Sequence, residues 1–368
     1  MTILDRYILR SLVVNYLIAL AVMISLYVVL DLFVNMDEFT ESSGSTATTV
    51  AGIFSYYGNN LFLYFAQLSG VITLFACLAA VARMRRQNEM TAILASGVSL
   101  YRVAAPVLAF GLLTGTLWFV DTELVIPAVA HKLARRHDDA LGRRTYGVWF
   151  LKDRNNALLS AQKFDPSAQT MKRMLVMYPD ESGNVEHVLE AEEARWKPEA
   201  RYAAGGIWEL QRGLVRTRRA GDEPRLGPQD DVQEEPVRFY ESDLTPEAIQ
   251  LRQSSQWVQY LSSAQLARLV DKGELDPARI QHIKHNRFAT PIVNLILLLL
   301  GLPFMLGAIA GDILSDGARC LAVCGACFLL SFAGQNLAVE GSLAALPSWL
   351  PIFLFTPAAV VLLDRIKT

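Results

Sequence analysis

The chain has 368 residues, of which 52% are hydrophobic, and its 34 basic and 36 acidic residues leave a formal net charge of −2. It contains no Gly-x4-Gly-Lys-Ser/Thr phosphate loop, no His-Glu-x-x-His and no Gly-x-Ser-x-Gly, so neither nucleotide hydrolysis nor the commoner hydrolase mechanisms have a visible site. We therefore expect no catalytic residue, cofactor, metal or nucleic-acid partner.

Six segments lack charged residues over a length that can cross a bilayer, for which roughly 18 apolar residues suffice. They are 11–30, 42–82, 103–120, 288–311, 320–339 and 341–363. The start of the second segment, 42–50, is rich in Ser and Thr and predicts a loop before a span near 52–82.

Basic residues indicate how these spans are oriented, because cationic loops stay in the cytoplasm. In the short loops and at the termini they lie on one side only, as Arg6, Arg10, Arg83, Arg85, Arg86, Arg102, Arg319, Arg365 and Lys367. The opposite loops, 36–51 and 340–350, contain no base. Both termini are therefore predicted to be cytoplasmic, and the first apolar run to be an uncleaved anchor without a nearby small-x-small cleavage site.

Residues 83–97, between the second and third spans, predict a short cytoplasmic amphipathic helix. Glu89, Ile93 and Ser96 recur at helical spacing, and Gly97 is a natural C-cap residue. Such a helix either rests on anionic headgroups or docks into a partner. The isolated Glu89 favours docking, because a carboxylate can meet a partner's arginine.

Residues 131–275 predict a separate domain outside the cytoplasm. Runs of clustered or alternating apolar residues at 156–164, 173–178 and 206–217 are separated by turn signals, which is an all-β pattern. The polar stretch 221–235 is predicted as a mobile loop. The domain lacks cysteine and therefore an internal disulfide.

Two helix starts follow the predicted strands. Ser262 and Ser263 can cap a helix running to Asp271, while Asp276 and Pro277 can start a helix that continues into the fourth span. The predicted organisation is thus 1–130 with three spans, 131–275 as the β domain and 276–368 with three further spans.

Polar and small residues within the spans predict packing rather than chemistry. Seven amides are interpreted as interhelical hydrogen-bonding groups: Asn15, Asn59, Asn60, Gln67, Asn294, Gln335 and Asn336. Four cysteines are interpreted as small packing residues rather than zinc ligands: Cys77, Cys320, Cys324 and Cys327. Gly111-x3-Gly115 predicts a close helix contact, either within the chain or between chains.

Three motifs carry a resemblance to a known family. The opening Leu4-Asp5-Arg6-Tyr7-Ile8, the segment from Glu89 to Ser99 and the run Gly147-Val148-Trp149-Phe150-Leu151-Lys152-Asp153 resemble the LptF/LptG family of lipopolysaccharide-export permeases. The order of three spans, β domain and three spans is similar over nearly the whole chain. The first and third motifs lean toward the LptG branch.

The resemblance implies a fold and a mechanism. The fold is a six-span α-helical bundle with an inserted periplasmic β-jellyroll in the bacterial inner membrane. A second LptF/LptG-type permease and a dimeric cytoplasmic, LptB-like ATPase would be partners, and lipopolysaccharide would pass to LptC/LptA-like periplasmic jellyroll proteins. Glu89 matches the acidic residue that contacts the ATPase; Ile93 lies on that helix, which Ala95, Ser96 and Gly97 close.

The sequence departs from the LptG pattern at the outer end of the first span. Acidic Asp31, Asp37 and Glu38 stand where that branch carries bases for lipid phosphates. Lys132, Arg135 and Arg136 can supply a positive field instead, or can simply snorkel at a helix end. The partner subunit can also supply the bases, or the lipid can be less phosphorylated.

An apolar lumen in the β domain is a second expectation for lipid contact, since a curled antiparallel sheet can enclose one. Its candidates are Leu158, Leu175, Trp208 and Leu210, although an ordinary core would use the same residues. A lipoprotein-release or FtsX-type permease, which usually has four spans, and a non-transporting membrane scaffold are the alternative functions.

Overall fold

The structure is a computed structural model that describes residues 3–37, 46–133, 145–179, 184–199, 201–202, 205–217, 233–254, 257–271, 275–306, 313–336 and 345–364. The chain divides into two compact units. One comprises Met1–Val34, Asn60–Ala128 and Gln259–Thr368, and the other comprises Asn35–Asn59 and Val129–Val258. We call them the helical unit and the sheet unit.

Within the described ranges, six helices are long and apolar enough to cross a membrane. They contain α1 (Ile3–Val34), α3 (Thr46–Arg86), α5 (Leu100–Val120), α9 (Pro277–Leu306), α10 (Ile313–Asn336) and α11 (Leu346–Asp364). The third continues from α5 through the π-helical turn η1 (Asp121–Val125) into α6 (Ile126–Leu133). The prediction of six spans is confirmed.

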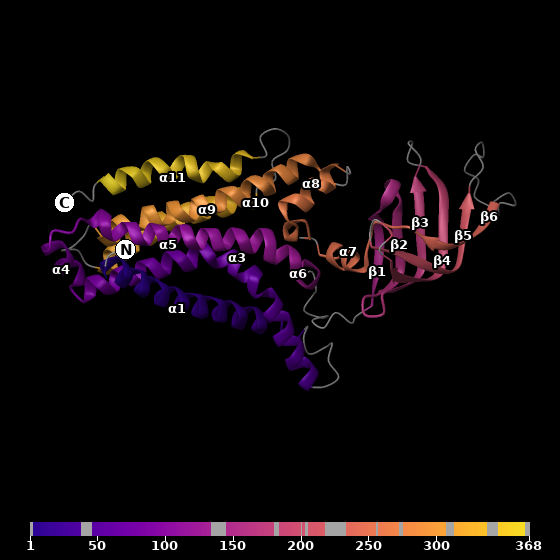
Figure 1. Cartoon of the computed structure of the whole chain (residues 1–368), viewed down its shortest axis with the longest axis horizontal. Coiled ribbons are helices and arrows are strands. Elements are labelled where there is room, and N and C mark those ends of the chain that lie inside the picture. The colour runs from indigo at the N-terminus through magenta and orange to yellow at the C-terminus, as the bar shows by residue number, and fades with distance from the viewer. Residues whose placement is uncertain are drawn as a thin grey trace. The chain divides into compact units, whose positions relative to one another are not determined.

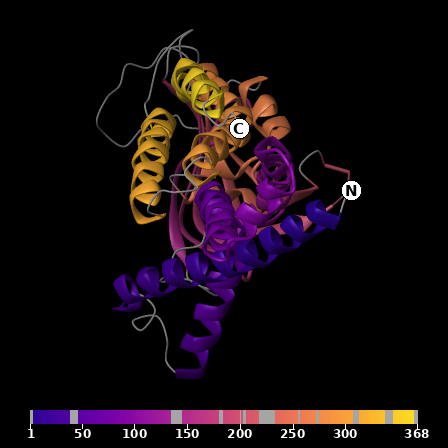
Figure 2. The ribbon, with the colours of Figure 1, turned by 90° about the vertical axis from the view of Figure 1, so that its left-hand side faces the viewer.

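Helix α9 lies centrally in the helical unit, where it packs against α5, α10 and α11, while α1 packs against α5. In the end-on view of Figure 2, α1 and α11 lie on opposite flanks. The two glycines of the close-packing motif explain the α5–α9 contact. A Cβ at Gly111 would clash with Leu298 Cδ1, and one at Gly115 would lie 3.5 Å from Pro291 Cβ. The motif therefore serves a contact within the chain.

Two expectations for the helices are wrong. Of the predicted loop at 42–50, the described residues from Thr46 onward are already helix α3, since a nucleated helix extends at little cost per residue; residues 42–45 lie outside the described residues. Asn15, Asn59 and Asn336 do not bond across helices, since each donates to the carbonyl four residues earlier on its own helix, at 2.8, 2.6 and 2.8 Å.

Both predicted helix starts after the strands are confirmed. Helix α8 (Ser263–Asp271) begins at the predicted serine pair, and α9 begins at Pro277. Asp276 accepts a hydrogen bond from the backbone N–H of Ala278 at 3.0 Å, as an N-cap residue does. Helix α9 then continues into the fourth span without a break.

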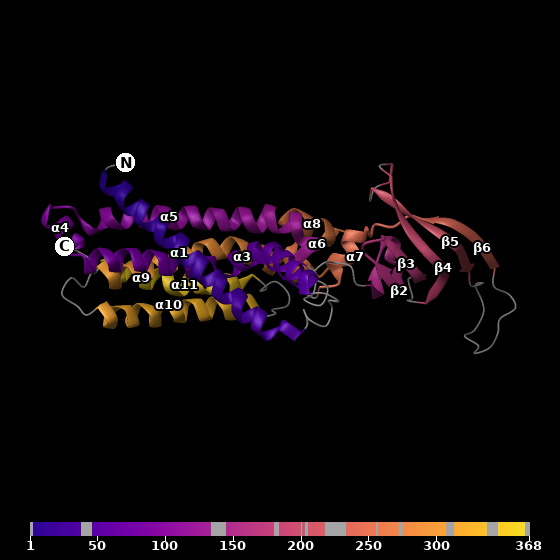
Figure 3. The same ribbon diagram turned by 90° about the horizontal axis from the view of Figure 1, so that it is seen from below.

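Three parts of the helical unit meet at one end. The start of α1, the short helix α4 (Glu89–Ala95) and the end of α11 lie together there, as Figures 1 and 3 show. The Tyr101 hydroxyl at the start of α5 donates to the Leu363 carbonyl of α11 at 3.2 Å. We call this the α4 end; α8 lies at the opposite end of the unit.

The sheet unit contains one six-stranded antiparallel sheet in the order β1-β2-β3-β4-β5-β6, so each strand pairs with its neighbours in sequence (Figure 1). Its strands are β1 (Tyr146–Lys152), β2 (Leu158–Asp165), β3 (Thr170–Pro179), β4 (Val185–Pro198), β5 (Gly206–Thr217) and β6 (Gln233–Tyr240). Short helices η3 (Arg154–Asn156), α7 (Pro246–Arg252) and η4 (Trp257–Tyr260) complete the described elements. The all-β prediction is confirmed.

Bulges bend this sheet. Phe150 on β1, Arg173 on β3 and Arg212 on β5 have positive φ angles of 49°, 50° and 51°. The pairing of β1 with β2 shifts in register between Val148 and Leu151, around Phe150. The pairing of β5 with β6 shifts between Glu209 and Gly213, around Arg212. Because bulges kink a strand and increase its twist, the sheet curls and buries one face.

The predicted loop at 221–235 lies mostly outside the described residues. Its last residues, from Gln233 to Glu235, are not loop but the start of β6. Glu234 is fixed there by an ion pair of 3.0 Å with Arg216 of the neighbouring β5. A cross-strand ion pair therefore continues the ladder into a segment whose composition suggested a loop.

Candidate functional site

The predicted short helix is shorter than 83–97. Arg83, Arg85 and Arg86 form the last turn of α3, and only Glu89–Ala95 forms α4. The break falls at Asn88, whose φ of 59° places it in the left-handed region that a continuous helix cannot include. Gly97 ends the segment with a φ of 80°, where glycine carries no Cβ penalty.

Helix α4 is held to the helical unit on one side and exposed on the other. Met90 is buried, and Ile93 and Leu94 pack against the same hydrophobic core. Of the predicted coupling residues, Ala95, Ser96 and Gly97 are exposed, while Ile93 is half-buried and Glu89 lies at the edge. The outward face is thus made of small residues, which allow another surface to approach closely.

Glu89 contacts the opening motif of the chain. The Tyr7 hydroxyl of α1 lies 2.8 Å from both carboxylate oxygens of Glu89. Two of the three motifs behind the family resemblance therefore touch in space, although their residues are 82 positions apart.

A buried ion pair lies beside the junction of α3 and α4. Arg85 approaches Asp316 of α10 at 3.3 Å, and each side chain is 7% exposed. Exposed Arg319 adds a longer contact of 3.9 Å to Asp316. Removing one partner of a buried pair leaves an uncompensated charge, so this pair fixes the end of α3 from which α4 extends.

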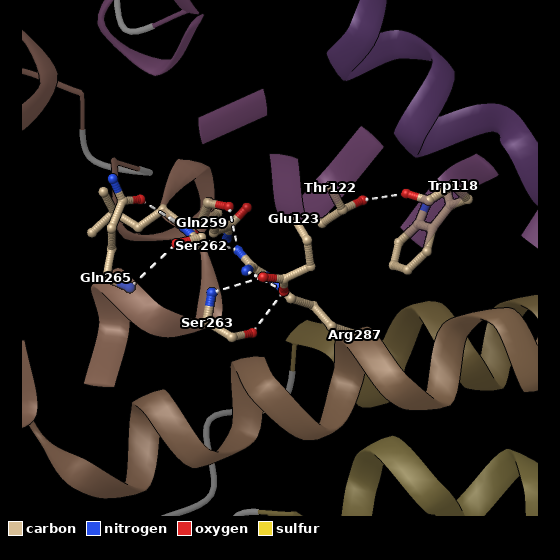
Figure 4. A network of polar contacts seen from close by, with 9 residues as sticks. Trp118, Thr122, Glu123, Gln259, Ser262, Ser263, Gln265 and Arg287 are labelled. Carbon is tan, nitrogen blue, oxygen red and sulfur yellow. Dashed lines mark hydrogen bonds and ion pairs between the residues drawn. The ribbon is translucent and has the colours of Figure 1, made fainter. Parts of the chain in front are cut away.

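A second polar network lies at the opposite end of the helical unit (Figure 4). Arg287 of α9 donates to Glu123 Oε1 of the π-helical turn at 2.9 Å, and it also donates to the carbonyls of Gln259 and Leu261. Ser263, the first residue of α8, donates its hydroxyl at 2.6 Å and its backbone N–H at 3.0 Å to the Glu123 carboxylate. Glu123 thereby joins the third span, the fourth span and α8.

A capping box completes this junction. The Ser262 backbone N–H donates to Gln265 Oε1 at 2.9 Å, and the Gln265 backbone N–H donates to Ser262 Oγ at 3.2 Å (Figure 4). The backbone N–H groups of Ser262 and Gln265 thus each have an acceptor. The sequence analysis predicted the serine cap but not the contact between Glu123 and Arg287. The only sequence signal for that contact is that each charged residue lies just outside an apolar segment, Glu123 after 103–120 and Arg287 before 288–311.

Asp121 lies at the start of the same π-helical turn. It is 5% exposed, and its Oδ2 atom finds no hydrogen-bond partner among the described residues. The next residue, Thr122, donates to the Trp118 carbonyl at 2.9 Å (Figure 4). A π turn inside an α-helix often marks a functional position.

The predicted lipid-contact bases are mostly outside the described residues. Lys132 is half-buried near the end of α6, whereas Arg135 and Arg136 fall in the segment that the structure does not describe. Of the acidic residues at the end of the first span, Asp31 lies in α1 and Asp37 is exposed, while Glu38 is not described. The described residues therefore include only one of the three predicted bases.

The four candidates for an apolar lumen do not share one face of the sheet. Trp208 is fully buried and Leu210 is 6% exposed, and both belong to the core of the sheet unit. Leu158 and Leu175 are partly exposed and alternate with buried Leu159 and Val176. Because neighbouring strand residues point to opposite faces, the two leucines lie on the other side.

The buried face is filled by side chains. Trp196 and Trp208 meet edge to face with centroids 5.1 Å apart, and the Trp208 indole donates to the Leu244 carbonyl at 3.2 Å. Ile249 of α7 joins the same cluster. Trp208 and Leu210 are thus core residues in this conformation, and a lipid chain can reach them only if the sheet opens.

Asp153, the last residue of the third motif, links the two edge strands of the sheet, β1 and β6, through hydrogen bonds. It follows β1 and accepts hydrogen bonds from Tyr240 of β6 at 2.7 Å and from Ser242 at 2.5 Å. The backbone N–H groups of Arg154 and Asp243 donate to its other oxygen at 2.7 and 2.9 Å. Burial, and then the nearby Asp153 carboxylate, raise the pKa of Tyr240, which therefore stays protonated as a donor.

The cysteines are buried in the helical unit. Cys320 and Cys324 direct their thiols at the carbonyls of Gly301 and Leu297 on α9. The described part of the chain holds no group of three or more His, Cys, Asp or Glu residues that could bind a metal ion. The contacts of Cys320 and Cys324 agree with the interpretation of the cysteines as small packing residues.

Comparison with known families supplies the identity that this architecture suggests. A family model described as lipopolysaccharide export system permease LptF/LptG matches residues 6–365. A search of curated proteins found no match. The match includes all six span-length helices and the sheet between them, and it does not separate LptF from LptG. The chain therefore belongs to the LptF/LptG family of lipopolysaccharide export permeases, which are multi-pass proteins of the inner membrane.

Proposed function

We propose that this permease is driven by a separate cytoplasmic ATPase that docks on α4. The observation that carries the proposal is the two-sided character of α4. Met90 anchors the helix to the hydrophobic core, while Ala95, Ser96 and Gly97 form an exposed surface beside the Glu89 carboxylate. A partner arginine can pair with that carboxylate through a charge-assisted hydrogen bond.

Charge supports a cytoplasmic position for the α4 end. Arg83, Arg86 and Arg102 lie there, next to the start of α1 and the end of α11. By the positive-inside rule, this end and both termini face the cytoplasm, and the six-stranded sheet lies in the periplasm. The sheet unit then passes lipopolysaccharide to periplasmic jellyroll proteins, and a second permease of this type completes the membrane pathway.

Orientation can be tested with one cysteine. Asn184 is exposed just before β4, and the four native cysteines are buried, so Asn184→Cys should dominate labelling. We expect an impermeant maleimide to label it from the periplasmic side of intact inner membranes. Labelling only from the cytoplasmic side would reverse the topology and exclude the proposed role of α4.

Reversing the charge of Glu89 on α4 tests the proposed function. Glu89→Arg should abolish ATP-driven lipopolysaccharide release from proteoliposomes, since the new cation would repel the partner's arginine. Glu89→Gln should retain part of the activity because an amide oxygen still accepts hydrogen bonds. Membrane insertion should be normal in both variants. Full transport by Glu89→Arg would contradict the proposal.

Lipid capture tests the route through the sheet. We expect photo-crosslinkers at Trp208 and Leu210 to capture lipopolysaccharide only during ATP turnover, because these side chains are buried at rest. Crosslinkers at Leu158 and Leu175 test whether the lipid contacts the opposite face of the sheet. Capture near Lys132 alone would indicate that the sheet is a brace and that the lipid leaves by another path.

A further inference from the structure

Tyr7 and Glu89 are both held on well-fixed elements. Ile8 and Leu12 of α1 are 2% and 0% exposed, and Met90 of α4 is 2% exposed. These anchors lie next to the two residues in question and belong to the same hydrophobic core. The distance between the Tyr7 hydroxyl and the Glu89 carboxylate is therefore set by the packing of two helices.

The hydrogen bond between them restrains Glu89 without using all of its accepting capacity. A tyrosine hydroxyl donates one proton, whereas a carboxylate has about four lone-pair sites on its two oxygens. The equal distances of 2.8 Å place the hydroxyl between the oxygens. The outward sites stay available to a second donor.

Helix α4 by itself does not fix this side chain. It has seven residues, and its N-cap Asn88 makes no side-chain capping bond; isolated helices of this length are unstable in water. A free glutamate would lose rotamer freedom on docking, which weakens binding. A carboxylate that is already restrained loses less.

We propose that Tyr7 is a positioning residue that orders the Glu89 carboxylate before the cytoplasmic ATPase binds. The inference rests on the proposed docking function of α4. Tyr7 acts through Glu89 and need not touch the partner, so its effect must disappear when Glu89 is absent.

The test is a double-mutant cycle in the reconstituted permease–ATPase complex. The concentration of the complex's own purified ATPase is varied, and lipopolysaccharide-stimulated ATP hydrolysis is measured. Tyr7→Phe keeps the ring and removes the hydroxyl. We expect it to raise the half-maximal ATPase concentration about three- to tenfold, with turnover at saturating ATPase and the thermal unfolding midpoint unchanged.

A second background and a matched control make the result specific. In Glu89→Ala, the further change Tyr7→Phe should shift the half-maximal concentration less than about twofold, because non-additivity identifies residues that act as one unit. Tyr101→Phe is the matched control, since its hydroxyl lies at the same end and bonds the Leu363 carbonyl instead. It should behave as wild type.

The possible failures separate the two claims. If Glu89→Ala weakens docking and Tyr7→Phe does not, the positioning role is wrong and the proposed function stands. An equal loss from Tyr7→Phe with and without Glu89, or tighter docking by Tyr7→Phe, also overturns it. If Glu89→Ala docks normally, the proposed contact fails and the positioning role fails with it.

Discussion

The two ends of the helical unit each carry a glutamate that links separate elements, and the two are held differently. Glu123, whose side chain is 16% exposed, receives Arg287 and two donors from Ser263. Glu89 stands at the edge of an exposed helix and receives the hydroxyl of Tyr7, which is itself 43% exposed. Burial with charged and backbone donors makes a carboxylate part of the fold, whereas a carboxylate at an exposed edge can still bind a partner.

Removing the cation from the buried network should have the largest effect. Arg287→Met leaves Glu123 without its counter-ion, and breaking a buried pair costs about 3–5 kcal/mol. We expect a matching loss in the free energy of unfolding in detergent. Arg319→Met is the control, because that side chain is 70% exposed and surface pairs contribute roughly 0–1 kcal/mol. Equal effects would remove the distinction between buried and exposed charges.

Asp153 tests whether the same rule holds in the sheet unit. Asp153→Ala removes the acceptor from Tyr240, Ser242 and two backbone N–H groups. Unsatisfied buried donors make a loss of about 2–3 kcal/mol the expected result. Asp153→Asn retains one acceptor oxygen and should lose less. Chemical unfolding monitored by near-ultraviolet circular dichroism measures both losses. An unchanged free energy of unfolding in Asp153→Ala would show that Asp153 does not stabilise the sheet.

Ser263 measures how much of the Glu123 network comes from neutral donors. Ser263→Ala removes the hydroxyl that bonds Glu123 at 2.6 Å and keeps the backbone N–H bond. We expect a loss of about 1 kcal/mol in the free energy of unfolding. Ser167→Ala, at an exposed hydroxyl in the sheet unit, is the comparison. A larger loss than for Arg287→Met would mean that the serine, and not the ion pair, holds α8.

Asp165 separates the number of donors from burial, because it is only partly buried and accepts three hydrogen bonds. The hydroxyl and backbone N–H of Ser167 and the backbone N–H of Ala168 lower the pKa of its carboxyl below the ordinary value of 3.8. A lowered folded-state pKa stabilises the protein above that ordinary value, and the stabilisation disappears as the pH falls through the folded-state pKa.

We therefore expect a small decrease in the unfolding midpoint of the sheet unit as the pH falls below 3.8, corresponding to less than about 1 kcal/mol for a partly exposed carboxylate. Asp165→Asn should remove that part of the pH dependence, and thermal unfolding at stepped pH measures it. If the variant keeps the same acid sensitivity, other carboxylates are responsible.

Local sequence patterns were sufficient for much of the fold. Uncharged runs located six spans because crossing a bilayer demands length and apolarity. Alternation located β2, β3 and β5, and Asp276 with Pro277 located the start of α9. The pattern failed where a single backbone angle decided the outcome, as at Asn88, which separates α4 from α3.

The sequence by itself determined the number of spans, the β character of the insertion and the family, since these depend on composition, period and motif. Only the tertiary structure decided which residues meet. Tyr7 reaches Glu89 across 82 positions, Tyr240 reaches Asp153 across 87 and Arg287 reaches Glu123 across 164. Such pairs leave no local signal, because helix packing and sheet curvature determine which distant side chains come within hydrogen-bonding distance.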